Sequence, residues 1–172
     1  MSATTSVIRS LAELDAFLPR WQEFIRTRAG RCRFHQDPVV VCLSLRHDPS
    51  SSPCVVVVES DAGIQCVAPC SCRERSYPLR LGLVQVAASR ARILKIHGDT
   101  FVHATGADVR ANTRIVLDAL ASPGMDWDFM LLENLPVPSP MWDHFHDVGA
   151  CVGTLSMDVL PTLAKLAGAE LP

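Results

Sequence analysis

The stretch CVVVVESDAGIQCVAPCSC, residues 54–72, predicts two adjacent strands and decides the fold. Valines fill positions 55–58, and β-branched side chains favour the extended backbone. Residues 60–63 read Ser-Asp-Ala-Gly, a sequence typical of a tight turn in which Gly63 can adopt a positive φ. Because both strands are apolar at most positions, we expect both faces of their sheet to be covered. The stretch therefore predicts a central sheet with helices packed on it.

A helix is predicted before this hairpin. Ser10 and Glu13 have the Ser-x-x-Glu spacing of a capping box, and apolar residues follow at helical intervals up to Ile25. Pro19 lies inside this pattern, where it removes a backbone hydrogen bond. We therefore expect a kink or two abutting helices, ending at Gly30.

A second helix is predicted just before the hairpin, although the signals conflict. Asp37 followed by Pro38 is typical of a helix start, whereas the valines at 39–41 favour a strand. We favour a short helix up to about Arg46.

After the hairpin we expect two more strands and then helices and strands in turn, which is not a strict βαβ alternation. We expect a polar connection over residues 73–78, strands over 79–87 and 93–96, and a helix capped by Asp108 and ended by residues 122–124. A strand over 129–132, a helix from Ser139 to Gly149, a strand over 151–157 and a short helix or frayed tail over 162–167 follow. The fold class is therefore α/β, with a mixed, mainly antiparallel sheet flanked by helices.

Composition limits the classes of protein to which the chain can belong. Its 172 residues, 48% hydrophobic and 20% charged, suit one domain spanning residues 1–172. A net charge of -2 does not favour nucleic acid as a partner, and no apolar run is long enough for a membrane span. The N-terminus has no apolar core of a secretory signal, so we expect a cytoplasmic protein. Seven cysteines in that compartment do not predict a disulfide framework.

Several short motifs, taken in order, resemble a known family. They are Trp21 in the leading helix, Phe-His-Gln-Asp-Pro at 34–38, Val-Ala-Pro at 67–69, Gly98-Asp99, and Trp-Asp-Phe-Met-Leu-Leu-Glu-Asn-Leu-Pro at 127–136. On these motifs the chain resembles the N-terminal half of the GNAT-like acyltransferases of the CelD/BcsL cellulose-biosynthesis type, which carry two GNAT-like halves in tandem. The resemblance implies a GNAT-like fold, acetyl-CoA or another acyl-CoA as cofactor, and a homodimer or a partner protein that supplies the second half.

The chain departs from the family at the cofactor loop. GNAT enzymes bind the acyl-CoA pyrophosphate on backbone N–H groups of an Arg/Gln-x-x-Gly-x-Gly/Ala loop at a helix N-terminus. The nearest segment, residues 103–108, lacks the basic or amide residue and the second glycine, and Asp108 would repel a phosphate. We therefore expect a non-catalytic or substrate-side module without its own pyrophosphate loop. The alternatives are an active acetyltransferase with a degenerate CoA site and a cysteine-based metal-binding module.

Two groups of residues are candidates for the site. His97 could act as a general base oriented by Asp99, since both follow a predicted strand; the structural alternative is a polar loop in which Asp99 caps backbone donors. Basic residues gather between positions 73 and 95 and could attract a CoA phosphate; the alternative is a solvated sheet face. The candidate cofactor-binding residues are Arg73, Arg75, Arg80 and Arg92.

The cysteines of the second strand are the remaining candidates. Cys66, Cys70 and Cys72 could bind a metal with His97 or His103, but only Cys66 and Cys70 have a usual zinc spacing. All three share one face of a regular strand, which is also the pattern of buried core cysteines. We therefore expect no metal ligands.

Overall fold

The computed structural model describes residues 3–81, 83–132 and 135–147. The elements within these residues, in chain order, are β1 (Thr4–Ile8), α1 (Leu11–Thr27), the short 3-10 helix η1 (Phe34–Gln36), α2 (Pro38–His47), β2 (Ser51–Ser60), β3 (Gly63–Leu81), β4 (Val84–Ile96), β5 (Val102–His103), α3 (Val109–Leu120), β6 (Phe129–Leu131) and α4 (Pro140–Asp147).

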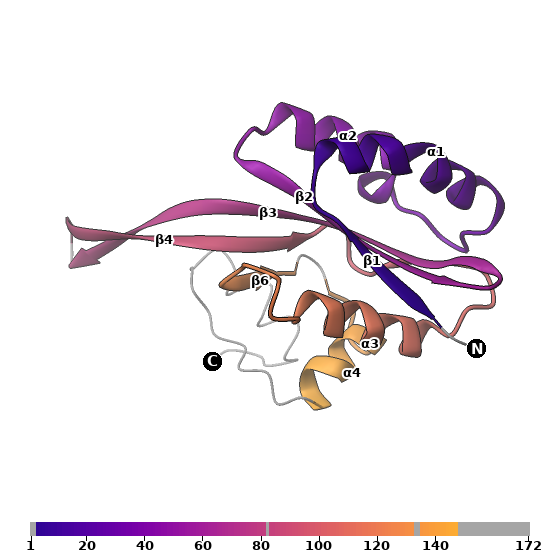
Figure 1. The fold of residues 1–172 in the computed structure, drawn as a ribbon. Coiled ribbons are helices and arrows are strands. Elements are labelled where there is room, and N and C mark those ends of the chain that lie inside the picture. The colour runs from indigo at the N-terminus through magenta and orange to yellow at the C-terminus, as the bar shows by residue number, and fades with distance from the viewer. Residues whose placement is uncertain (1–2, 82, 133–134, 148–172) are drawn as a thin grey trace.

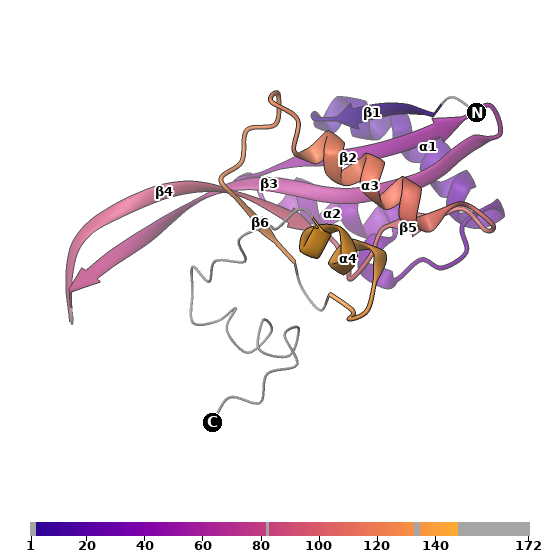
Figure 2. The same cartoon turned by 90° about the horizontal axis from the view of Figure 1, so that it is seen from below.

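The described strands form one sheet in the order β1-β2-β3-β4-β6, with β5 paired to β3. The β4–β6 pair is parallel, and the other pairs are antiparallel. Helices α1 and α2 cover one face of the sheet, and α3 and α4 cover the other (Figures 1 and 2). The predicted mixed, mainly antiparallel sheet flanked by helices is confirmed.

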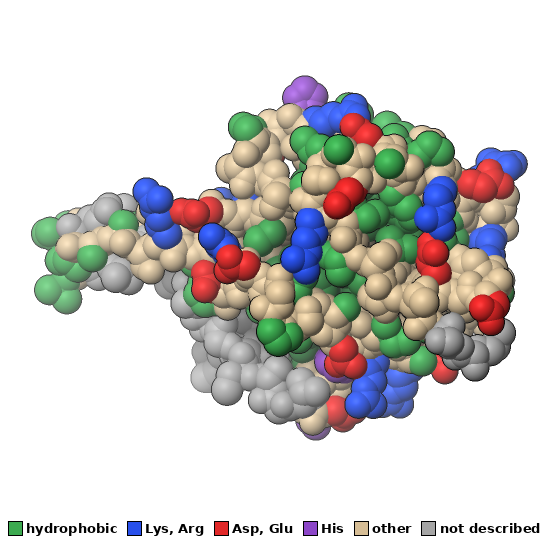
Figure 3. All heavy atoms as spheres, in the orientation of Figure 1, with side chains coloured by type: hydrophobic (Ala, Val, Ile, Leu, Met, Phe, Trp, Pro, Cys, Tyr) green, Lys and Arg blue, Asp and Glu red, His purple; other side chains and the backbone are tan. Residues whose placement is uncertain are grey.

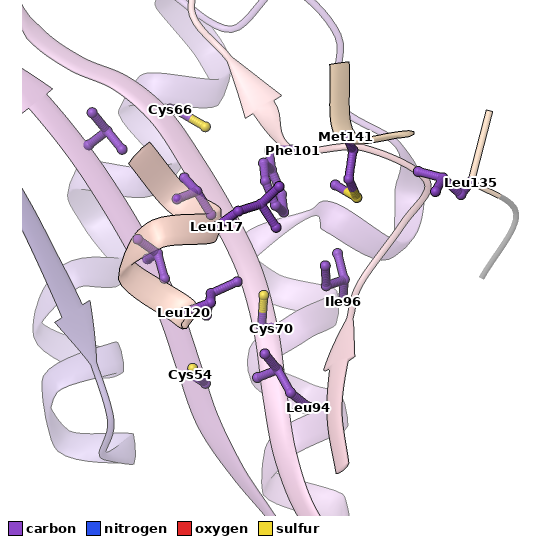
Figure 4. Packing of buried hydrophobic residues seen from close by; sticks show 14 residues of the cluster. Cys54, Cys66, Cys70, Leu94, Ile96, Phe101, Leu117, Leu120, Leu135 and Met141 are labelled. Atoms are coloured by element: carbon purple, nitrogen blue, oxygen red, sulfur yellow. The ribbon is translucent and has the colours of Figure 1, made fainter. Parts of the chain in front are cut away.

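Alternation along the strands explains why the sheet has two apolar cores. Val56 and Val58 face α3 and α4, whereas Val55 and Val57 face α1 and α2. Figure 4 shows the first core, in which Leu117 and Leu120 of α3 lie against the sheet. Both faces of β2 are thus buried, as its continuous run of valines predicts.

Helix α1 begins with the predicted capping box. The Ser10 hydroxyl accepts from the Glu13 backbone N–H at 3.2 Å, and the Glu13 carboxylate accepts from the Ser10 N–H at 3.2 Å. Pro19 lies inside one helix, so the prediction of two abutting helices is wrong, and the helix ends at Thr27 rather than Gly30. The one hydrogen bond that Pro19 removes is offset by the burial of a helix face that includes Trp21 and Phe24.

Helix α2 confirms the choice of helix over strand. The Asp37 carboxylate accepts from the Val39 and Val40 backbone N–H groups, at 2.9 and 3.4 Å, and Pro38 occupies the first turn. This capping outweighs the strand propensity of the valines. The predicted helix after Asp108 and the strand near Phe129 are also present, as α3 and β6.

The region after Cys72 differs most from the prediction. Residues 73–78 are part of β3, not a polar connection, and the predicted strand 79–87 is divided by a turn between Leu81 and Val84. Strands β3 and β4 instead form one long hairpin, paired from Cys70↔Ile96 to Leu81↔Val84. We call residues 74–90 the arm, because they project beyond the helices (Figures 1 and 3). Every described side chain of the arm is exposed.

Two short strands were not predicted, β1 and β5. Helix α4 begins at Pro140 as expected. The predicted terminator Gly149, the strand 151–157 and the helix 162–167 lie outside the described residues. In the part of the chain that the structure describes, no helix combines the length and apolar character needed to cross a bilayer.

Candidate functional site

A cavity of about 280 Å³ lies where the arm leaves the body of the protein. Its walls come from the start of β2, the middle of β3, the end of β4, Arg9 and the loop before β6. The lining residues are Arg9, Ser50, Ser52, Pro53, Cys54, Cys72, Arg73, Glu74, Arg92, Leu94, Gly124, Met125, Asp126 and Trp127. Three arginines and two acidic residues therefore surround the cavity, which gives its walls a formal charge of +1.

Two of the arginines attach the loop before β6 to the sheet. Arg9 donates through Nη1 to the Gly124 carbonyl at 2.9 Å. Arg92 forms an ion pair with Asp126, and its backbone N–H donates to Asp128 Oδ2 at 2.7 Å. These contacts define one side of the cavity, and they occupy hydrogen-bonding groups of both arginines.

Arg73 differs from the other two arginines. Its Nε is buried and has no hydrogen-bond partner in the described structure. The pKa of the neighbouring Asp48 is lowered, mainly by hydrogen bonds from the Ser50 and Ser51 hydroxyls, with a smaller contribution from Arg73. Arg73 therefore brings a buried, unused donor and a positive charge to the cavity.

The structure brings two of the four predicted arginines, Arg73 and Arg92, together at the cavity. Arg73 and Arg92 lie on paired strands, one register position apart, and both line the cavity. Arg75 is exposed on the arm and does not line it, and the side chain of Arg80 lies outside the described part. Sequence reasoning missed Arg9 and the loop 124–127, because these residues are more than a hundred positions apart and no local pattern connects them.

His97 and Asp99 lie in the loop after β4, each beside a residue that was not predicted. His97 Nε2 lies 3.0 Å from the Ser71 hydroxyl oxygen. Asp99 forms an ion pair with Arg33, and its Oδ1 is buried without a hydrogen-bond partner among the described residues. The loop is held against η1 by this ion pair, and the general-base role of His97 stays a prediction.

A second histidine, His103, is half-buried, with both ring nitrogens shielded from solvent. It lies opposite Cys66 in the β3–β5 pair, on the face of the sheet that α3 covers. Neither ring nitrogen has a hydrogen-bond partner in the described structure. Burial lowers the pKa of His103 to about 4, so the ring is neutral at pH 7.

The cysteines of β3 have the environment of core residues. Cys66 and Cys70 are fully buried, and burial raises the pKa of both thiols. Burial also raises the pKa of the neighbouring Cys54 to about 12. Metals bind the thiolate form, which these environments disfavour. Within the described residues, no three His, Cys, Asp or Glu side chains are grouped to hold a metal ion.

Comparisons with known proteins were made for the whole chain. No protein-family model and no curated protein matches the sequence. Among solved structures, a ribosomal-protein-alanine N-acetyltransferase from Brucella melitensis biovar Abortus 2308 is 15% identical, with 91% of this chain and 96% of that chain covered and a TM-score of 0.41.

Two further structures are similar to the same degree. A GNAT family acetyltransferase from Staphylococcus aureus is 12% identical, covers 81% of this chain and 94% of that chain, and has a TM-score of 0.43. A GCN5-related N-acetyltransferase from Ralstonia eutropha JMP134 is 15% identical and has a TM-score of 0.40, with 91% of this chain and 96% of that chain covered. At TM-scores below 0.5, these likenesses carry no inference about the function of this chain.

Proposed function

We propose that the chain is a GNAT-like domain of the CelD/BcsL type, related to acyl-CoA-dependent N-acyltransferases, and that it acts as a non-catalytic or substrate-side module. Its ligand would be an acyl-CoA such as acetyl-CoA, held by its phosphates at the cavity that Arg73 and Arg92 line. The observation that carries the proposal is the buried Nε of Arg73, which has no partner in the described structure. A buried, unpaired donor costs about 1–3 kcal/mol, which a ligand oxygen accepting from it would recover.

The chemistry of the cavity suits a phosphate. A guanidinium can donate two parallel hydrogen bonds to a phosphate, and the walls have a surplus of positive charge. The volume of about 280 Å³ lies just below the range of small-molecule sites, which span roughly 300–1,000 Å³. The cavity therefore fits the phosphate-bearing part of a CoA molecule better than the whole of it.

The first turn of α3 supports the absence of a pyrophosphate loop. The segment nearest to such a loop, residues 103–108, leads into α3, where Asp108 Oδ1 accepts from the Ala111 N–H at 3.0 Å. A carboxylate at this helix end repels a phosphate and occupies one of the donors that would bind it. In our proposal a homodimer or a partner protein supplies the second GNAT-like half, and only a partner with a different sequence can supply the missing loop.

Calorimetric titration tests the proposal. CoA and acetyl-CoA are expected to bind with micromolar affinity, about -8 kcal/mol, whereas pantetheine, which has no phosphates, is expected not to bind. Arg73→Gln should weaken CoA binding about 10-fold or more, since it removes a charged hydrogen bond. Arg75→Gln is the matched control, because Arg75 lies on the same strand but outside the cavity.

Three results would contradict the assignment. Absence of CoA binding would refute the proposal that the ligand is an acyl-CoA. Equal binding of pantetheine would show that the phosphates do not contribute. Equal losses in the Arg73 and Arg75 variants would mean that the effect is one of net charge and not of the cavity.

The second function is an active acetyltransferase with a degenerate CoA site. It is favoured by the position of His97, whose Nε2 lies 3.0 Å from the Ser71 oxygen at the end of a strand. In this function His97 takes a proton from the amine acceptor, and the Arg33–Asp99 ion pair holds the loop. Turnover of acetyl-CoA with a panel of amines tests it, with His97→Gln expected to lower kcat and leave CoA binding unchanged. No turnover with any acceptor would remove this function.

A further inference from the structure

The arm is a two-stranded ribbon that extends past the layers that cover the rest of the sheet. Strand β2 pairs with β3 up to Arg73, and β6 pairs with β4 at residues 93–95. Beyond these points each arm strand is paired with the other alone among the described residues. The helices cover the body and leave the arm uncovered (Figure 2). An isolated two-stranded ribbon is marginally stable in water, so this element gains stability from a covering surface.

The free end of the arm is apolar. Leu83 is 100% exposed, Leu81 77%, Val84 65% and Val86 62%. Figure 3 shows hydrophobic side chains gathered at this end. Together they present on the order of 400 Å² of apolar area, the size of patch that marks an interaction site on a soluble protein.

The charge of the arm is opposite to that of the rest of the chain. Residues 74–90 carry three basic residues and one acidic residue, a net charge of +2. The remaining sequence carries 13 basic and 17 acidic residues, a net charge of -4. The body of another copy of the same chain is therefore complementary to the arm in charge.

We propose that the arm is the interface of a homodimer, in which each arm lies with its apolar end on the body of the other copy. A standard interface buries about 800 Å² per partner, slightly more than half of it apolar, and the arm end supplies about that apolar share. A two-fold arrangement places both arms at once and closes the assembly. The dimer forms whether or not the cavity binds a phosphate.

Features of the arm strands disfavour the alternative of edge-to-edge pairing between two arms. Pro78 in β3 lacks a backbone N–H, and the ladder shifts register between Leu79 and Arg80. Irregularities and charged residues of this kind prevent strands from adding to an edge. The arm is therefore expected to pack through its side chains on the body of the other copy.

Light scattering after size exclusion, over a range of concentrations, tests the dimer. The wild-type chain is expected to dimerise, and the double variant Leu83→Asp/Val86→Asp is expected to raise the dissociation constant about 100-fold or more. Both side chains are exposed, so the variant keeps its fold, which circular dichroism verifies. Leu11→Asp, at an exposed position on α1 in the body, is the matched control and is expected to leave the dimer intact.

Photo-crosslinking locates the contact. A benzoylphenylalanine at position 83 is expected to attach to a body peptide of the other copy, and raised salt is expected to weaken the dimer because the charges are complementary. A wild-type monomer at every concentration, or a dimer that tolerates the double variant, overturns the proposal. A crosslink from arm to arm overturns the arrangement proposed here. A failed CoA titration leaves these results unchanged, so the two proposals fail separately.

Discussion

The half-buried His103 predicts that stability decreases as the pH falls below neutral. Its pKa is about 4 in the folded chain, because burial disfavours the charged ring, and about 6.5 when the chain is unfolded. Above pH 6.5 the ring is neutral in both states and contributes no pH dependence. Between pH 6.5 and pH 4 the unfolded chain binds a proton that the folded chain does not, so unfolding is favoured. Below pH 4 both states are protonated and the loss reaches its limit.

The magnitude follows from these two pKa values. Linkage gives a loss of about 2 kcal/mol between pH 7.5 and pH 5, and about 3 kcal/mol at its limit. Urea denaturation of the wild-type chain at both pH values measures the total change, to which other titrating groups also contribute. His103→Leu removes this group and nearly preserves volume, so its loss over the same range should be about 2 kcal/mol smaller. Equal pH dependence in the two proteins would refute the reasoning.

Three further predictions concern stability, each measured by urea denaturation at neutral pH. Ser10→Ala removes the α1 cap and should cost about 1 kcal/mol; no change would mean that the capping box contributes nothing. Gly98→Ala should cost about 1–3 kcal/mol, because Gly98 has a φ of 106° and an added methyl would lie 2.6 Å from Gln36 Nε2; a neutral effect would contradict that geometry. Trp21→Ala should cost about 3–5 kcal/mol, since Trp21 is fully buried, and a loss below 1 kcal/mol would contradict its place in the core.

The parts of the fold that could be predicted from sequence are those that local chemistry determines. The β2–β3 turn, the Ser10 and Asp37 caps and the two-sided burial of β2 depend on residues close in sequence. The extent of the arm could not be predicted, because residues 73–76 read Arg-Glu-Arg-Ser and lack the apolar alternation that indicates a strand. Its Arg-Glu-Arg run resembles a loop until it pairs with the opposite strand. At Pro19 only the alternative of two abutting helices is wrong, since tertiary packing outweighs one lost hydrogen bond and keeps α1 a single helix.

The candidate site divides in the same way. Arg73 and Arg92 could be grouped from sequence because both belong to the basic cluster between positions 73 and 95, although the hairpin that pairs their strands was not predicted. Arg9 and the loop before β6 reach the cavity through the tertiary fold, and no spacing in the sequence predicts their contact. The partners of His97 and Asp99 were missed because Ser71 and Arg33 come from separate elements.

Strands β3 and β4 each run without a break from the body into the arm, and the cavity lies where the arm joins the body. Arg73, Glu74 and Arg92 belong both to the cavity wall and to the two strands that continue into the arm. A partner that binds the arm therefore contacts the same two strands that carry Arg73 and Arg92, the residues proposed to bind a phosphate. Thermodynamic linkage makes such a connection reciprocal: a partner that changes the affinity of the cavity by some factor has its own affinity changed by that same factor when the cavity fills. Phosphate binding in the cavity and partner binding at the apolar end of the arm would then change each other's affinity, although the residues at that end do not line the cavity.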